Sequence, residues 1–140
     1  MSETTAVSAY VLDASAVIAF VRDEPGASVV RLALDQRCVI SAVNLAEVLT
    51  KMQDKGATPE QADHAARVLG LEVADFGTQA AQACARLRTA TRSQGLSLSD
   101  RACLALAKHL DAPVLTADRP WLALKATLGL DIRCIRPETH

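Results

Sequence analysis

The sequence lacks the short motifs that identify several common kinds of functional site. Its four cysteines are widely separated, without a C-x-x-C pair or a histidine at zinc-finger spacing, so a structural zinc site is not expected. It has no G-x-G-x-x-G run and no G-K-[ST] loop, which argues against the usual dinucleotide and nucleoside triphosphate sites. We therefore expect Cys38, Cys84, Cys103 and Cys134 to be free thiols in the core.

Aromatic residues and net charge are both scarce. Only 3% of the residues are aromatic, so extensive stacking on nucleic-acid bases is not expected. The formal net charge is −1, so no overall positive field would attract nucleic acid to this chain. Any contact with nucleic acid must use a local group of basic side chains.

A secretory signal and membrane-spanning segments are not expected either. The first residues, MSETT, lack the basic start and the apolar run of a secretory signal. Charged residues, among them Asp13, Arg22 and Glu47, interrupt every apolar stretch before it reaches the roughly 18 residues of a membrane span. We expect a cytoplasmic protein without a membrane partner.

What the sequence does have is an alternation of short apolar runs with helical patterns. Its 140 residues, 50% of them hydrophobic, suit one domain over residues 1–140. Strands are predicted at 9–12, 38–40, 71–74, 113–116 and 132–135, and helices at 14–21, 27–34, 44–55, 59–69, 80–87 and 102–110. Because strands that alternate with helices are joined by right-handed crossovers, we expect an α/β fold with three α/β/α layers and a mostly parallel sheet of about five strands.

Acidic residues stand where such a fold binds ligands, at the carboxyl ends of the strands. Asp13 directly follows the first predicted strand, and Asp118 follows the strand at 113–116. Glu47 and Asp100 are expected in the first turns of helices that begin at the same edge. Four carboxylates in one cleft repel one another unless a cation neutralises them, and all-oxygen ligation favours Mg²⁺ or Mn²⁺.

Each acid also has an ordinary structural interpretation as part of a helix cap. Asp13, Asp118, and either Ser99 or Asp100 precede helical segments and could be N-caps. The stretch 44–47 has the form of a capping box, and Glu47 could pair with Lys51 one turn later. Capping and cation binding are compatible in one residue, so it is the gathering of all four acids at one edge that indicates a site.

The acids fall in four motifs that together resemble the PIN-domain nucleases, specifically the small VapC-type ribonuclease toxins of bacterial toxin–antitoxin pairs. The motifs are VLDAS at 11–15, SAVNLAEV at 41–48, LSD at 98–100 and LTAD at 115–118. Each motif is common by itself, but their order and spacing match the family over nearly the whole chain.

The resemblance implies roles for individual residues. It makes Asp13, Glu47, Asp100 and Asp118 the acidic quartet that binds Mg²⁺ or Mn²⁺ and hydrolyses RNA phosphodiester bonds, with Asp13 and Asp100 as the expected direct ligands. It also implies that the hydroxyl groups of Ser15 and Thr116 hold the first and last acids, and that Asn44 supports the quartet. Some relatives carry a further acid shortly after the last one, whereas this chain reads Arg119-Pro120-Trp121 there, so the number of ions stays open.

Partners follow from the same resemblance. It implies an RNA substrate, a small VapB-type antitoxin and a homodimer, with the helices at 27–34 and 44–55 as candidate interfaces. Arg101 and Arg119 each follow a predicted ligand and are our candidates for contacts with RNA phosphates. The basic residues of the helix at 80–87 and its end, Arg86, Arg88 and Arg92, are interpreted as a solvated face.

Two other interpretations remain at this point. A phosphoacceptor receiver domain has a similar size and α/β order, and Asp75 could imitate its acceptor, but this chain has no acidic pair after the first strand and no lysine after the strand at 113–116. The other is a PIN-like binding module without activity. The complete set of four acids argues against that loss of activity.

Overall fold

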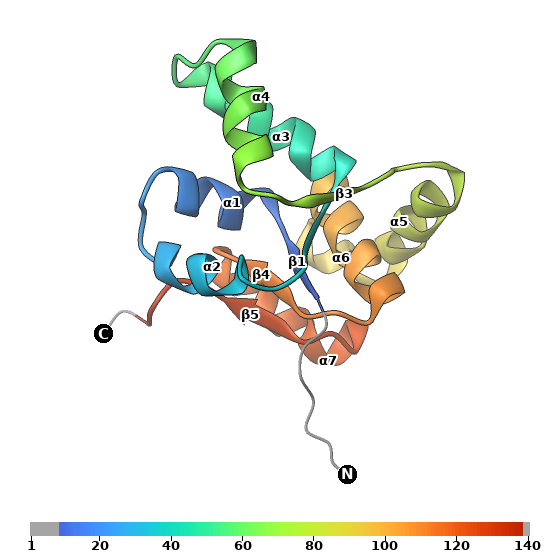
Figure 1. The fold of residues 1–140 in the computed structure, drawn as a ribbon. Helices are drawn as coiled ribbons and strands as arrows, with labels where there is room; N and C mark the ends of the chain where they lie inside the picture. The colour runs from blue at the N-terminus through green and yellow to red at the C-terminus, as the bar shows by residue number, and fades with distance from the viewer. Residues whose placement is uncertain (1–8, 139–140) are drawn as a thin grey trace.

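The computed structural model describes residues 9–138, in which five strands form one sheet (Figure 1). The strands are β1 (Tyr10–Leu12), β2 (Cys38–Ser41), β3 (Glu72–Ala74), β4 (Val114–Thr116) and β5 (Ile132–Cys134). The α-helices are α1 (Ala14–Val21), α2 (Ala27–Ala33), α3 (Ala42–Asp54), α4 (Pro59–Val68), α5 (Thr78–Ala90), α6 (Leu98–Leu110) and α7 (Lys125–Leu128), with 3₁₀ helices η1 (Arg92–Gln94) and η2 (Arg119–Leu124).

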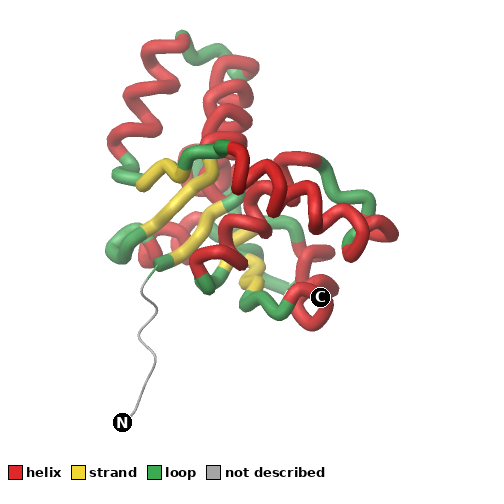
Figure 2. The backbone as a smooth tube through the Cα atoms, turned by 90° about the vertical axis from the view of Figure 1, so that its right-hand side faces the viewer, coloured by secondary structure: helices red, strands yellow, loops and turns green. Residues whose placement is uncertain are grey.

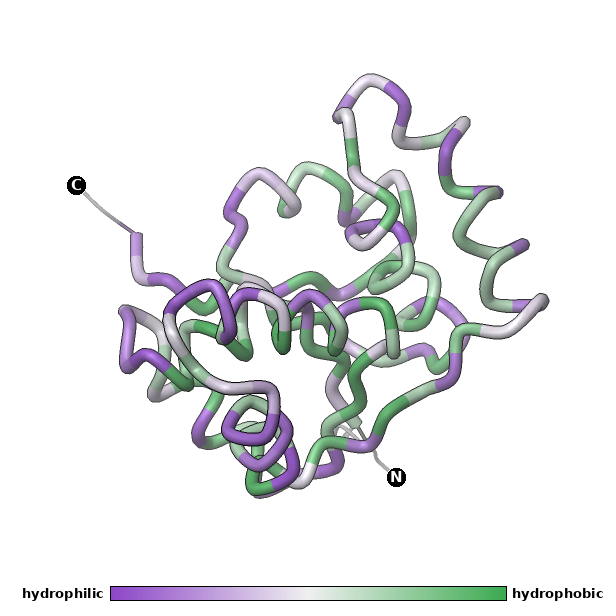
Figure 3. Tube along the Cα trace, turned by 90° about the horizontal axis from the view of Figure 1, so that it is seen from above, coloured by the Kyte–Doolittle hydropathy of each residue, from purple (hydrophilic) through white to green (hydrophobic). Residues whose placement is uncertain are grey.

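The sheet is wholly parallel in the order β3-β2-β1-β4-β5. Its strands lie among the surrounding helices in Figure 2. Two apolar cores cover its faces, one between the sheet and α5, α6 and η2, the other between the sheet and α1 to α4. Viewed from above, many of the hydrophobic stretches of the chain run through the middle of the molecule (Figure 3). The predicted α/β fold, with helices on both faces of a five-stranded parallel sheet, is confirmed.

The strand order determines where a ligand can bind. The chain runs outward from β1 to β2 and β3 on one side and returns to β4 and β5 on the other, so the order reverses at β1. Parallel sheets bind ligands at this point, outside the carboxyl ends of the strands. A receiver domain has the order 2-1-3-4-5, so the observed order excludes that interpretation.

Several helix ends differ from the prediction because the capping residues lie earlier in the sequence. Ser41 caps α3 by accepting a hydrogen bond from the amide of Val43, so Asn44 is not a capping residue and Glu47 lies in the second turn. Ser97, rather than Ser99 or Asp100, caps α6. The side chain of Asp118 caps nothing.

The expectation that the cysteines are free thiols in the core is met for three of the four. All four cysteines are free; three are buried and Cys134 is partly exposed. His64 and His109 are exposed, whereas His140 lies outside the described residues. Over residues 9–138, no helix has both the length and the apolar character needed to cross a membrane.

Gly26 is the glycine whose replacement should disturb the fold most. It caps α2 with a φ of +98°, and an added Cβ would lie 2.7 Å from the carbonyl oxygen of Ile135. We expect Gly26→Ala to lower the free energy of unfolding by about 3 kcal/mol, from backbone strain and overpacking together. Gly56→Ala is the matched control, because its φ is +106° but no atom lies within 4 Å; it should cost about 1 kcal/mol. Equal losses in urea unfolding would contradict the proposed clash.

Candidate metal centre

Asp13 is the most buried acid of the candidate site. It follows β1 and is the N-cap of α1, where its Oδ1 accepts a hydrogen bond of 2.9 Å from the amide of Ala16. The hydroxyl group of Ser15 donates to the same carboxylate at 2.7 Å, and the hydroxyl group of Thr116 donates to Oδ2 at 2.6 Å. Asp13 is only 5% exposed, and these three hydrogen-bond donors fix its side chain in place.

The two hydroxyl groups also connect the ends of β1 and β4. Ser15 Oγ accepts a hydrogen bond from the amide of Ala117 at 2.9 Å, and Thr116 Oγ1 accepts one from the amide of Asp118 at 3.0 Å. Each hydroxyl thus donates to Asp13 and accepts from the segment that follows β4. Thr116 holds the backbone of Asp118 rather than its carboxylate.

Burial makes the charge of Asp13 unfavourable. Loss of solvent raises the pKa of this carboxyl from 3.8 to about 6, and the nearby charge of Asp100 adds to the increase. The three hydrogen bonds act in the opposite direction but do not cancel the effect of burial. A cation beside the carboxylate would offset the remaining penalty.

Asp100 is close enough to Asp13 and Asp118 for its charge to act on both. It is the third residue of α6, where its Oδ2 accepts a hydrogen bond of 3.1 Å from the amide of Ser97 in a capping box. Asp118 is exposed beside it, and partial burial together with the charge of Asp100 raises the pKa of Asp118. Asp100 therefore acts on the carboxylates that follow both β1 and β4.

The thiol of Cys103 marks where the acids come together. It is fully buried on α6, one turn after Asp100, and its pKa is well above the usual range because of burial and the charges of Asp13, Asp100 and Glu47. The sequence offered no signal for this position beyond the spacing of three residues from Asp100. Glu47 also approaches Lys51, with a nitrogen–oxygen distance of 4.0 Å, as its spacing suggested.

Asn44 joins the two helices that carry Glu47 and Asp100. Its Nδ2 donates a hydrogen bond of 3.0 Å to the carbonyl oxygen of Ser99, across 55 positions of sequence. Asn44 is 2% exposed, and its Oδ1 has no hydrogen-bond partner among the described residues. A buried acceptor without a partner is costly, so a donor such as a water molecule would be stabilised there.

The donor set suits a hard cation, but the side chains do not yet surround one. The four predicted ligands offer only oxygen atoms, which Mg²⁺ and Mn²⁺ prefer. Within residues 9–138, no three His, Cys, Asp or Glu side chains converge tightly enough to hold an ion. Burial of Asp13 and the neighbouring charge of Asp100 leave negative charge uncompensated, so the chemistry of these donors fits a hard cation.

The two candidate arginines are both held by backbone carbonyl groups. Arg101 donates to the carbonyl oxygen of Cys84 at 3.1 Å, so its guanidinium group lies against α5, with a buried Nε that has no partner among the described residues. Arg119 is exposed beside Asp118 and donates to the carbonyl oxygen of Arg136 at 2.8 Å. Arg119 is the more accessible of the two.

Residues 10–126 match the family model of the PIN domain. No curated protein sequence matches significantly.

Solved structures with similar folds include three toxin–antitoxin complexes. VapBC2 from Rickettsia felis, bound to a DNA fragment from its promoter, has a TM-score of 0.70 at 19% identity, covering 90% of this chain and 98% of that chain. VapBC-1 from nontypeable Haemophilus influenzae has a TM-score of 0.69 at 22% identity, covering 91% and 98%. VapBC-5 from Mycobacterium tuberculosis has a TM-score of 0.56 at 25% identity, covering 93% and 99%.

The raised pKa of Asp13 predicts how stability changes with pH. The folded chain binds a proton at Asp13 more tightly than the unfolded chain does. The protonated carboxyl group therefore stabilises the fold fully below pH 3.8, and this contribution to stability is lost as the pH rises through about 6. In chelator, the free energy of unfolding of the wild type should therefore fall over this interval relative to Asp13→Asn, by about 3 kcal/mol. Urea unfolding at a series of pH values measures the difference.

The control is Asp54→Asn, an exposed acid at the end of α3. Its stability should follow that of the wild type at every pH. A constant difference between wild type and Asp13→Asn would show that burial does not perturb Asp13.

Proposed function

This chain belongs to the PIN domain family, and from that membership we propose that it is a metal-dependent endoribonuclease, the toxin of a VapBC-type toxin–antitoxin pair. The observation that carries the proposal is Asp13, a buried carboxylate with uncompensated charge at the reversal point of the sheet, acted on electrostatically by Asp100. The folds of the solved VapBC complexes support the assignment to the toxin component.

In this proposal the quartet Asp13, Glu47, Asp100 and Asp118 holds Mg²⁺ or Mn²⁺. Such an ion makes water more acidic and neutralises charge on phosphate oxygens during hydrolysis of a phosphodiester bond. Asp13 and Asp100 are the direct ligands, because both are positioned by hydrogen bonds in the first turn or at the start of a helix. Asp118 is the most exposed and lies toward the substrate side.

The surrounding polar groups orient the acids. Hydrogen bonds from Ser15 and Thr116 favour the ionised form of Asp13, which is the form that binds a cation. Asn44 keeps the start of α6 against α3 through Ser99, and its Oδ1 can accept a hydrogen bond from a water molecule in the site. At the rim, Arg119 would contact an RNA phosphate, with Arg101 as a second candidate after its release from α5.

The partners of the proposed toxin are an RNA substrate, a small VapB-type antitoxin and a second copy of this chain. The solved neighbours include toxin–antitoxin complexes, which supports an antitoxin partner. A PIN-like module without activity is the alternative function, and the same assay decides between them.

Cleavage of a structured RNA pool by the antitoxin-free protein tests the activity. Wild type should cleave with Mg²⁺ or Mn²⁺ and not with chelator, and Asp13→Asn and Asp100→Asn should each lower the rate at least about 100-fold, because an anionic ligand is lost. Asp111→Asn at the other end of α6 is the matched control and should retain activity. Circular dichroism must confirm that each variant folds.

Wild type that binds the ion but leaves every RNA intact would favour the inactive module. Cleavage that persists in Asp13→Asn or in chelator would exclude the proposed centre.

The interaction of Asn44 with Ser99 gives a separate prediction about the affinity for the ion. Asn44→Leu keeps the size of the side chain but removes the hydrogen bond between α3 and α6, so affinity for Mn²⁺ should fall about 10-fold to 100-fold. Isothermal titration calorimetry measures this directly. Thr50→Val is the control on the same helix, since the hydroxyl group of Thr50 donates to the carbonyl oxygen of Ala46 within that helix. Unchanged affinity in Asn44→Leu would mean that Asn44 does not position the acids.

A further inference from the structure

Buried polar atoms without a hydrogen-bond partner are concentrated around the acidic site. Among the described residues they belong to the side chains of Asn44, Arg101 and Trp121. In the sequence, each of these residues lies within three positions of one of the four acids of the site. Since folded proteins leave few buried polar atoms unpaired, this concentration indicates donors and acceptors that serve the site itself.

Trp121 is held in place by the apolar core. The residue is 3% exposed and belongs to the core between the sheet and α5, α6 and η2. It is the third residue of η2, and its backbone amide donates a hydrogen bond of 3.1 Å to the carbonyl oxygen of Asp118. Side chains three positions apart lie above one another in a 3₁₀ helix. This turn therefore brings the indole ring and the carboxylate of Asp118 to the same side of the chain.

The indole N–H group faces this carboxylate without a completed hydrogen bond. Partial burial and the charge of Asp100 raise the pKa of Asp118, whereas the N–H group of Trp121 acts in the lowering direction. The two groups nevertheless do not reach the distance and angle of a hydrogen bond, because Nε1 has no partner among the described residues. A small movement of the exposed carboxylate would complete the contact.

The chemistry of the two groups is complementary. Indole can only donate a hydrogen bond, and an ionised carboxylate can only accept one. If Trp121 served only to fill the core, an apolar ring would do so without the cost of a buried N–H group that lacks an acceptor. The N–H group is therefore better explained by an acceptor at the site.

Asp118 is also the acid that needs such a donor. Hydrogen bonds hold the carboxylates of Asp13 and Asp100 at the starts of α1 and α6. The side chain of Asp118 makes no capping hydrogen bond at the start of η2. Carboxylates that bind metal ions are usually oriented by a hydrogen bond to the oxygen that the ion leaves free.

From these observations we propose that Trp121 is a positioning residue of the metal centre, whose indole N–H group holds one oxygen of Asp118 and leaves the other oxygen to the cation. The inference rests on the proposed function, in which Asp118 belongs to the quartet that binds the ion. The contact between Trp121 and Asp118 can be measured without any ion, so the two can fail separately.

The first test uses the indole N–H group itself. The chain has one tryptophan, so a ¹⁵N–¹H spectrum contains one indole cross-peak. In cation-free protein, Asp118→Ala should move this peak upfield in the proton dimension, because the N–H group loses the carboxylate that it faces. Saturating wild type with Mg²⁺ should move it downfield as the hydrogen bond is completed. The backbone amide peaks show whether each variant is folded.

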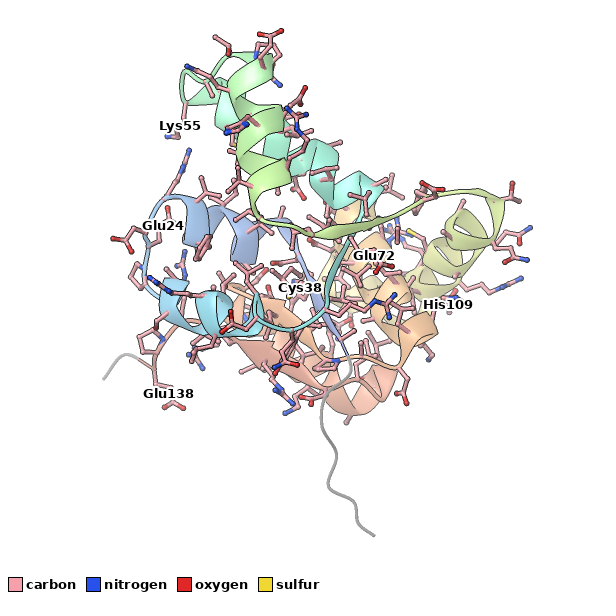
Figure 4. The ribbon with its side chains drawn as sticks, viewed as in Figure 1. Glu24, Cys38, Lys55, Glu72, His109 and Glu138 are labelled. Atoms are coloured by element: carbon pink, nitrogen blue, oxygen red, sulfur yellow. The ribbon has the colours of Figure 1, made fainter. Side chains whose placement is uncertain are left out.

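Glu72→Gln is the matched control for this spectrum. Glu72 is an exposed acid on β3 (Figure 4), at the edge of the sheet on the other side of β1 from β4. Its loss should leave the indole peak in place. An indole peak that is unchanged in a folded Asp118→Ala overturns the proposed contact.

A double-mutant cycle then tests whether Trp121 acts through Asp118. By isothermal titration calorimetry, Trp121→Phe should lower the affinity for Mn²⁺ about 10-fold, because the ring is kept but the donor is lost. In the background of Asp118→Asn, the same change should have no further effect. Leu124→Val is the control, a core truncation at a residue of η2 that is 1% exposed. It should lower the unfolding temperature and leave the affinity for Mn²⁺ unchanged.

The possible failures are distinguishable. Wild type and Trp121→Phe that bind Mn²⁺ equally overturn the role of Trp121 and leave the proposed function intact. Equal losses of affinity in both backgrounds mean that the ring only supports the fold, which also overturns it. Wild type that binds no Mn²⁺ overturns the metal centre and the role of Trp121 together.

Discussion

The carboxylate of Asp13 accepts the hydrogen bonds that hold the ends of β1 and β4 and the start of α1 together. It is enclosed at the end of the middle strand, where the amide of Ala16 and the hydroxyl groups of Ser15 and Thr116 all donate to it. The same hydroxyl groups accept amides from the segment after β4, so one buried anion organises the ends of two strands and the start of α1. Removing its solvent is what raises its pKa to about 6.

This arrangement links function to a local loss of stability. Three hydrogen bonds are insufficient to compensate for burial, and Asp100 adds a second negative charge nearby. A fold selected only for stability would place a neutral side chain here. Cation binding would explain why the charge is retained. The unfavourable burial of the Asp13 charge destabilises the cation-free chain, and the same unfavourable energy favours binding of a cation.

Much of this could be predicted from the sequence, and the exceptions have physical causes. Short apolar runs followed by Asp13 and Asp118 place both acids at strand ends, because buried parallel strands are continuously apolar. The sequence does not single out the helix caps, because several Ser, Asn and Asp residues near each helix start can all serve as caps. The bond from Asn44 to Ser99 spans 55 positions and has no local signal. The place of β3 at the sheet edge depends on the strand order, which local patterns do not determine.

Strand order ultimately explains how residues so distant in sequence share one site. Ser15 and Thr116 act on the same carboxylate only because β4, rather than β3, lies next to β1. In the alternative order of a receiver domain, β3 would occupy that place, and Asp75 would lie near the centre of the sheet. The observed order instead brings the acid after β4 to the centre and leaves β3 at the edge. The same topological choice therefore assembles the acidic site and leaves β3 paired with β2 alone among the described strands.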